Sequence, residues 1–191
     1  KKCIELAQDL GVRTIQLAGY DVYYEEKSPQ TRQRFIKNLR KACDWAEEAQ
    51  VVLAIEIMDD PFINSIEKYL AVEKDVDSPY LFVYPDIGNV SAWHNDVYSE
   101  FYLGHHAIAA LHLKDTYAVT ESSKGQFRDV PFGQGCVKWE EAFDILKQTN
   151  YNGPFLIEMW SENCETVEET RAAIQEAQAF LYPLIKKAGL M

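Results

Sequence analysis

The chain of 191 residues is long enough for one domain with a sizeable buried core, and with 47% hydrophobic and 26% charged residues its composition is ordinary for a globular protein. A net charge of −11 is unfavourable for nucleic-acid binding, which needs a basic surface. No apolar stretch is long enough to cross a bilayer, and we expect no signal peptide. Four scattered cysteines without CxxC spacing are typical of a reducing compartment, so we expect a cytoplasmic protein that binds neither nucleic acid nor membrane.

Helical and strand-like patterns alternate along the chain. Residues 1–10 have the pattern of the second half of an amphipathic helix, which ends at Gly11, so we expect the chain to begin inside a larger unit. Apolar runs predict strands at residues 12–19, 51–58, 79–89, 108–115 and 153–160. Periodic patterns predict helices at residues 28–50, 64–76, 95–106, 138–148 and 166–188, and a long polar loop at 116–135.

This alternation predicts an α/β fold with a parallel sheet. No glycine-rich nucleotide-binding motif follows a strand, and polar side chains at several strand ends favour a closed (β/α)8 TIM barrel over an open sheet. Such a barrel has eight strands, whereas about five βα units are visible. We therefore expect residues 1–191 to form a single domain, the C-terminal two-thirds of a barrel whose first three units precede Lys1.

Four of the predicted strands each end with one side chain that can bind a metal: Glu56, Asp86, His112 and Glu158. Each has an ordinary alternative, since a core Glu can pair with a cation, an Asp can form a turn, and a lone His can be a core residue. If each residue had only such a structural role, the placement of all four at the same end of successive strands would be a coincidence. Three carboxylates and one imidazole suit Mg²⁺, Mn²⁺, Co²⁺ or Zn²⁺, so the sequence predicts a divalent-metal site.

Several short motifs make the prediction more specific: IQLAGYDVYY, AIEIMD, YPDIGN, HLKD, VPFGQG and LIEMWSE. Over nearly its whole length the chain resembles the L-ribulose-5-phosphate (L-xylulose-5-phosphate) 3-epimerases of bacterial L-ascorbate and pentose utilisation. These enzymes are a branch of the xylose-isomerase-like barrels. The resemblance implies an isomerase that inverts C3 of a ketopentose 5-phosphate through an enediolate, with a divalent metal ion as cofactor.

The resemblance also assigns roles to residues. The metal ligands fall on the same four strand-end residues, and Glu56 and Glu158 additionally serve as the acid/base pair. Asn89 and Arg128 correspond to substrate contacts, and we expect Asp115 to orient a metal ligand. The expected partner is a small sugar phosphate, and a homodimer is the expected assembly.

Two other interpretations remain open. Another isomerase of the same barrel class, such as an aldose–ketose isomerase or a hydroxypyruvate-type isomerase, would share the metal and differ in the substrate loops. A truncated chain could instead keep the ligands as an inactive remnant or binding module. An endonuclease of the same superfamily would need more His ligands and a basic face, which the net charge of −11 opposes.

Overall fold

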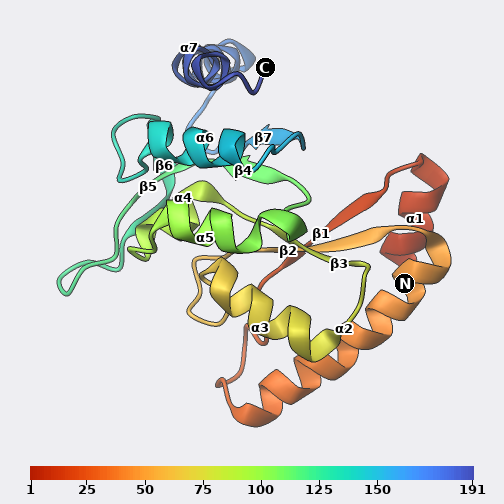
Figure 1. The fold of residues 1–191 in the computed structure, drawn as a ribbon. Helices are drawn as coiled ribbons and strands as arrows, with labels where there is room; N and C mark the ends of the chain where they lie inside the picture. Colours follow the sequence, from red (N-terminus) through yellow and green to blue (C-terminus); the bar gives the residue numbers. More distant parts are fainter.

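Five short parallel strands form the centre of the molecule, which a computed structural model describes for all residues 1–191. The strands are β1 (Thr14–Ala18), β2 (Val52–Glu56), β3 (Leu81–Tyr84), β4 (Leu111–Leu113) and β7 (Phe155–Ile157). β1, β2 and β3 pair in that order, and β4 pairs with β7. Parallel bridges from Val83 to Ile108 and from Asp86 to His112 join β3 to β4. The spatial order is therefore β1-β2-β3-β4-β7, a strand arrangement of the kind found in a TIM barrel (Figure 1).

Helices follow the strands in the order expected for βα units. They are α1 (Lys2–Leu10), α2 (Pro29–Ala49), α3 (Ile66–Val76), α4 (Ile87–Ala92), α5 (Val97–Gly104), α6 (Trp139–Gln148) and α7 (Val167–Ala188), with a short 3₁₀ helix at His105–Ala107. Figure 1 shows α2, α3, α5 and α6 along one side of the strands, and α7 at the opposite end of the molecule from α2. None of the helices is long and apolar enough to cross a membrane.

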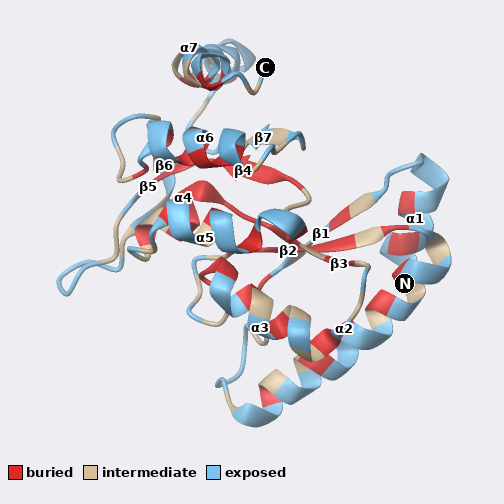
Figure 2. Ribbon diagram, viewed as in Figure 1, coloured by how far each residue is buried: buried red, intermediate tan, exposed pale blue.

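Local sequence explains where these elements begin and which faces they bury. The long helix α2 starts at a capping box, in which Ser28 and Thr31 exchange side chain–backbone hydrogen bonds, with Pro29 in the first turn. In β2 the residues from Leu53 to Glu56 are all buried, as expected for a parallel strand covered on both faces. Figure 2 shows the buried residues concentrated on β2, β3, β4 and the helix faces toward them, while α7 is mostly exposed. The strand ends are therefore held by a continuous apolar core.

The predicted α/β fold with parallel strands is confirmed, and two local predictions are wrong. Residues 116–135 are not simply a loop, because β5 (Asp115–Tyr117) and β6 (Gln126–Val130) form an antiparallel pair there. The strand predicted for residues 79–89 ends early, because Asp86 is the N-cap of α4 and its side chain accepts a hydrogen bond from the backbone N–H of Asn89. Both differences lie beside the strand ends that carry the predicted ligands.

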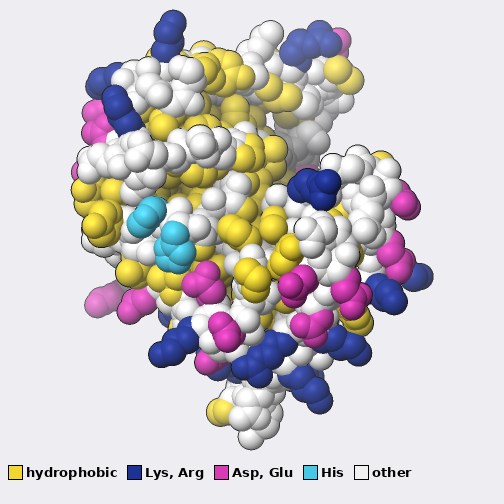
Figure 3. All heavy atoms as spheres, turned by 45° about the vertical axis from the view of Figure 1, so that its right-hand side comes forward, with side chains coloured by type: hydrophobic (Ala, Val, Ile, Leu, Met, Phe, Trp, Pro, Cys, Tyr) yellow, Lys and Arg dark blue, Asp and Glu magenta, His cyan; other side chains and the backbone are white.

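Charged side chains of both signs lie close together on one face of the molecule. On the face shown in Figure 3, Lys and Arg lie among Asp and Glu over the lower half, and apolar side chains are exposed above them.

Candidate active site

The four predicted ligands converge at the carboxyl ends of β2, β3, β4 and β7. One ligand atom from each of Glu56, Asp86, His112 and Glu158 lies within 4.8 Å of the other three. His112 Nδ1 is 2.9 Å from Glu158 Oε2, 3.0 Å from Glu56 Oε1 and 3.9 Å from Asp86 Oδ2. The imidazole nitrogen thus faces one oxygen of each carboxylate.

This cluster has more negative charge than the surrounding protein balances. Asp86 is fully buried and Glu56 is 7% exposed, and Lys114 is the lysine that lies among them. Asp86 Oδ2 and Glu158 Oε2 accept no hydrogen bond, although Lys114 and His112 lie within ion-pair distance of them. Buried carboxylate oxygens without hydrogen bonds are costly unless a cation compensates them. The donor set therefore fits a divalent metal ion held by three carboxylates and one imidazole.

The pKa values in the cluster reflect the same excess of negative charge. Burial alone would lower the pKa of His112, but its interactions with the neighbouring carboxylates of Glu158 and Glu56 outweigh burial and raise this pKa to about 9. Burial raises the pKa of Asp86 well above its usual range, and the positive charge of Lys114 only partly opposes that. For Glu158, burial is outweighed by His112, Asp86 and Lys114, so its pKa is lowered. Both raised pKa values favour the protonated forms of His112 and Asp86 when no cation balances the carboxylates.

Asp86 divides its two oxygens between different tasks. Oδ1 accepts the backbone N–H of Asn89 at 2.8 Å and so starts α4, while Oδ2 faces the cluster. Asn89 is 1% exposed, and its side-chain amide donates to the carbonyl of Ile57 at 2.9 Å, which connects α4 to the end of β2. The other amide atom, Asn89 Oδ1, has no hydrogen-bond partner.

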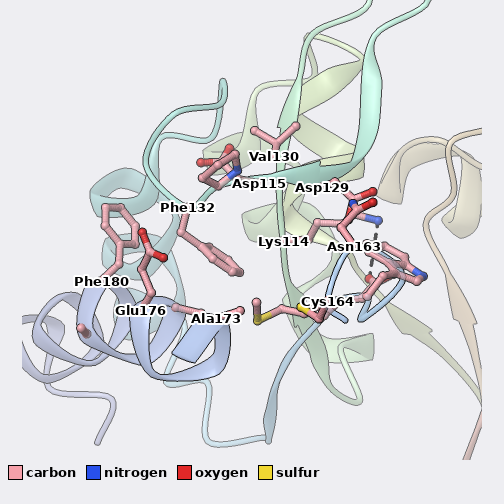
Figure 4. Close-up of a pocket in the computed structure, with 16 residues that line it drawn as sticks. Lys114, Asp115, Asp129, Val130, Phe132, Asn163, Cys164, Ala173, Glu176 and Phe180 are labelled. Carbon is pink, nitrogen blue, oxygen red and sulfur yellow. Dashed lines mark ion pairs between the residues drawn. The ribbon is translucent and has the colours of Figure 1, made fainter. Parts of the chain in front are cut away.

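Arg128 lies on β6 and stacks over Trp160, which follows Glu158 by two residues. Its guanidinium carbon is 4.9 Å from the centre of the Trp160 ring, and Lys114 Nζ is 5.3 Å from the same ring. Arg128 is exposed and forms no ion pair with an acidic residue, unlike Arg32 and Arg34 on α2. A cavity of about 550 Å³ is bordered by Trp160, Lys114 and Glu158 (Figure 4).

Two residues at the site were not predicted from the sequence. Gln16 on β1 donates from Nε2 to Glu56 Oε2 at 2.5 Å, leaving Oε1 toward His112. Nothing in the pattern of β1 distinguishes this glutamine from a surface residue. Lys114 could have been found, because residues two apart on a strand share a face and His112 is a ligand.

Asp115 has a different role from the one expected. Its carboxylate accepts the backbone N–H groups of Gly133 at 2.8 Å, Gly135 at 3.2 Å and Val137 at 3.3 Å, and the indole N–H of Trp139 at 3.4 Å. A side chain at Gly135 would lie 2.0 Å from the carboxylate, so glycine permits this close approach. Asp115 therefore holds the loop between β6 and α6, and the prediction that it orients a metal ligand is wrong.

Comparison with known proteins agrees with this geometry. The family model of the xylose isomerase-like TIM barrels matches residues 1–184. The chain belongs to this family. Solved structures of similar fold include an L-ribulose 3-epimerase, with a TM-score of 0.78, 20% identity and coverage of 98% of this chain and 66% of that one. A xylose isomerase domain protein from Planctomyces limnophilus gives a TM-score of 0.77 at 22% identity and covers 98% of this chain and 63% of its own.

Relatives with higher identity carry more specific names. The chain is 51% identical over 191 residues to a Haemophilus influenzae protein named "Putative L-ribulose-5-phosphate 3-epimerase SgbU". It is 47% identical over 191 residues to the L-ribulose-5-phosphate 3-epimerase UlaE of Escherichia coli O157:H7. All of this chain is covered in both comparisons, and it spans 66% and 64% of the length of these two relatives.

Proposed function

We propose that the protein is a metal-dependent 3-epimerase that interconverts L-xylulose 5-phosphate and L-ribulose 5-phosphate. The observation that carries this proposal is the cluster of three carboxylates and one imidazole, with two buried oxygens that accept no hydrogen bond. The substrate class is supported by the names of relatives with 47–51% identity.

The two glutamates suit proton transfer on opposite faces of a sugar. Glu56 is the last residue of β2 and Glu158 directly follows β7, and β3 and β4 lie between those two strands. Inversion at C3 requires one carboxylate to remove the carbon-bound proton and a second group to return a proton from the other face. A divalent ion held by Glu56, Asp86, His112 and Glu158 would supply a Lewis acid that stabilises negative charge on the sugar oxygens. Mn²⁺, Mg²⁺, Co²⁺ and Zn²⁺ all suit this donor set.

Arg128 is the better supported of the two predicted substrate contacts. Its unpaired guanidinium, stacked on Trp160, is available for the planar, bidentate contact that arginine makes with phosphate. We assign it to the 5-phosphate. Asn89 can contact a sugar hydroxyl through Oδ1, which has no hydrogen-bond partner, while its amide nitrogen donates one hydrogen bond to the carbonyl of Ile57.

Solvent exchange tests the proposed reaction. The metal-loaded protein, incubated with L-ribulose 5-phosphate in D₂O, should form L-xylulose 5-phosphate with deuterium at C3, which NMR detects. Glu158→Gln should lose this turnover, by roughly the 10²- to 10⁴-fold that general acid–base catalysis contributes. The matched control is Glu162→Gln, on an exposed residue of the same loop, which should stay active. Formation of an aldose without C3 exchange would instead identify an aldose–ketose isomerase.

The expected cellular setting belongs to the same proposal. All four cysteines are free thiols, which supports a reducing compartment such as the cytoplasm. The homodimer expected for this chain would be measured by sedimentation equilibrium.

A further inference from the structure

Lys114 is a buried cation that neither metal binding nor proton transfer by two glutamates requires. Only 6% of the residue is exposed. It lies two residues after His112 and directly beyond the end of β4, and both side chains reach the carboxylate cluster, with Lys114 one step nearer the carboxyl end. In a parallel barrel the substrate reaches the strands from that end. Lys114 thus lies on the side of the cluster from which a substrate would approach.

Its contacts put the ammonium group beside the reacting region. Lys114 Nζ is 2.9 Å from Asp86 Oδ2 and 3.5 Å from Glu158 Oε2, and it also borders the cavity shown in Figure 4. Arg128, by contrast, is exposed on β6. Of the two cations around Trp160, Lys114 is the one held against the predicted ligands.

The charge of Lys114 works against metal binding, because an ammonium near a divalent ion repels it. With a divalent ion bound, the ion and Lys114 together would balance the three carboxylates, so Lys114 would present a fixed positive charge to any further negative charge that develops beside it. Removal of the C3 proton creates such a charge on the substrate oxygens, and preorganised donors at the place of charge development are a major source of catalysis.

We propose that Lys114 is a catalytic residue that donates a hydrogen bond to the C2 oxygen of the sugar as the enediolate forms. The inference rests on the proposed epimerase function. In the step, Glu56 or Glu158 takes the proton from C3, and the electron pair of the C–H bond forms the C2–C3 double bond while the C2 oxygen becomes negative. The other glutamate, which enters the step as the carboxylic acid, then gives its proton to C3 from the opposite face, the C2–C3 electron pair forms the new C–H bond, and the C2 carbonyl is restored; the two glutamates end with exchanged protonation states, which proton exchange with water resets. Lys114 stays protonated throughout, so the step is balanced without a further reactant.

The test compares Lys114→Met and Lys114→Gln with Lys138→Met, whose lysine side chain is 70% exposed. For each variant, kcat and KM are measured with L-ribulose 5-phosphate and with unphosphorylated L-ribulose, and Mn²⁺ affinity is measured by calorimetry. Lys114→Met should lose roughly 10²- to 10³-fold in kcat, as when one oxyanion donor is removed, by a similar factor for both sugars. Its Mn²⁺ affinity should equal or exceed that of the wild type, which also shows that the site is folded. Lys114→Gln, which keeps a neutral donor, should lose less, and Lys138→Met should match the wild type.

Three results would overturn the role of Lys114 alone, provided that the wild type is active. A loss confined to the phosphorylated sugar would make Lys114 a phosphate ligand. Wild-type turnover in Lys114→Met would leave only a charge-balancing role, and weakened Mn²⁺ binding in both Lys114 variants would indicate a structural role. A wild-type protein that binds Mn²⁺ but does not epimerise either sugar would overturn the proposed function, and this role with it.

Discussion

Asp86 and Asp115 are both buried carboxylates next to the ends of neighbouring strands, yet their surroundings are opposite. Asp115 is 1% exposed and accepts backbone or indole N–H groups of the loop from Gly133 to Trp139 with both oxygens. Asp86 is 0% exposed, and its Oδ2 accepts no hydrogen bond. A buried carboxylate surrounded by donors stabilises a loop, whereas one that faces other carboxylates is suited to bind a cation. Sequence position does not separate these two cases, but hydrogen bonding does.

The largest expected effect is on metal binding by Asp86→Asn. The change keeps the side-chain oxygen that caps α4 and removes the negative charge. Loss of a residue that only hydrogen-bonds a metal ligand lowers metal affinity by roughly 10- to 100-fold, and loss of a ligand's charge should lower Mn²⁺ affinity by more than that. Calorimetric titration measures this. Asp96→Asn is the matched control, because Asp96 caps α5 in the same way and does not belong to the cluster. Equal Mn²⁺ affinity in the two variants would contradict the metal site.

Asp115→Asn should show the reverse behaviour. An amide at this position would turn one NH₂ group toward the N–H groups that the carboxylate now accepts, so we expect the free energy of unfolding to fall by roughly 2–4 kcal/mol. Urea denaturation of the metal-free protein measures this loss. Mn²⁺ affinity of the folded variant should stay within a few-fold of the wild type. A stable variant with weakened metal binding would remove the contrast between the two carboxylates.

Metal affinity should also depend on pH. The pKa of His112 is about 9 in the metal-free protein, so the imidazole is protonated at pH 6–8 and a metal ion has to displace the proton. Because the neutral form becomes more abundant as the pH rises toward 9, apparent Mn²⁺ affinity should increase by up to about tenfold per pH unit. Titrations at pH 6, 7 and 8 measure the slope. A flat profile would indicate that His112 is not a ligand.

The smallest expected effect concerns Gln16. Gln16→Leu removes the donor to Glu56 Oε2, so the carboxylate loses one of the contacts that orient it. We expect Mn²⁺ affinity to fall by about tenfold or less, which is the lower end of the effect of losing a residue that hydrogen-bonds a metal ligand. Gln8→Leu on α1 is a control with a glutamine outside the cluster. An Mn²⁺ affinity for Gln16→Leu that fell as far as that of Asp86→Asn would make Gln16 essential to the site.

Much of the fold and the site core could be predicted from the chain. Continuous apolar runs such as that around Glu56 are the signature of strands buried on both faces, and parallel strands bring their carboxyl ends together. The antiparallel pair β5–β6 was missed because Gln126–Val130 is polar and largely exposed, so it shows no apolar alternation. Helix α4 was missed because the sequence Asp-Ile-Gly-Asn is as typical of a turn as of an N-cap. The contacts of Gln16 and Asp115 depend on long-range packing, which local patterns do not record.

The divided carboxylate of Asp86 has an evolutionary consequence. Asn at this position could begin α4 but would give up the charge, whereas Glu would keep the charge but is a poor helix N-cap. Exchanging the residue alone therefore sacrifices either the start of a helix or the coordination of an ion. We expect chains that retain both to be confined to aspartate here, so this one position can tell sequence surveys which related barrels have kept the centre and which have abandoned it.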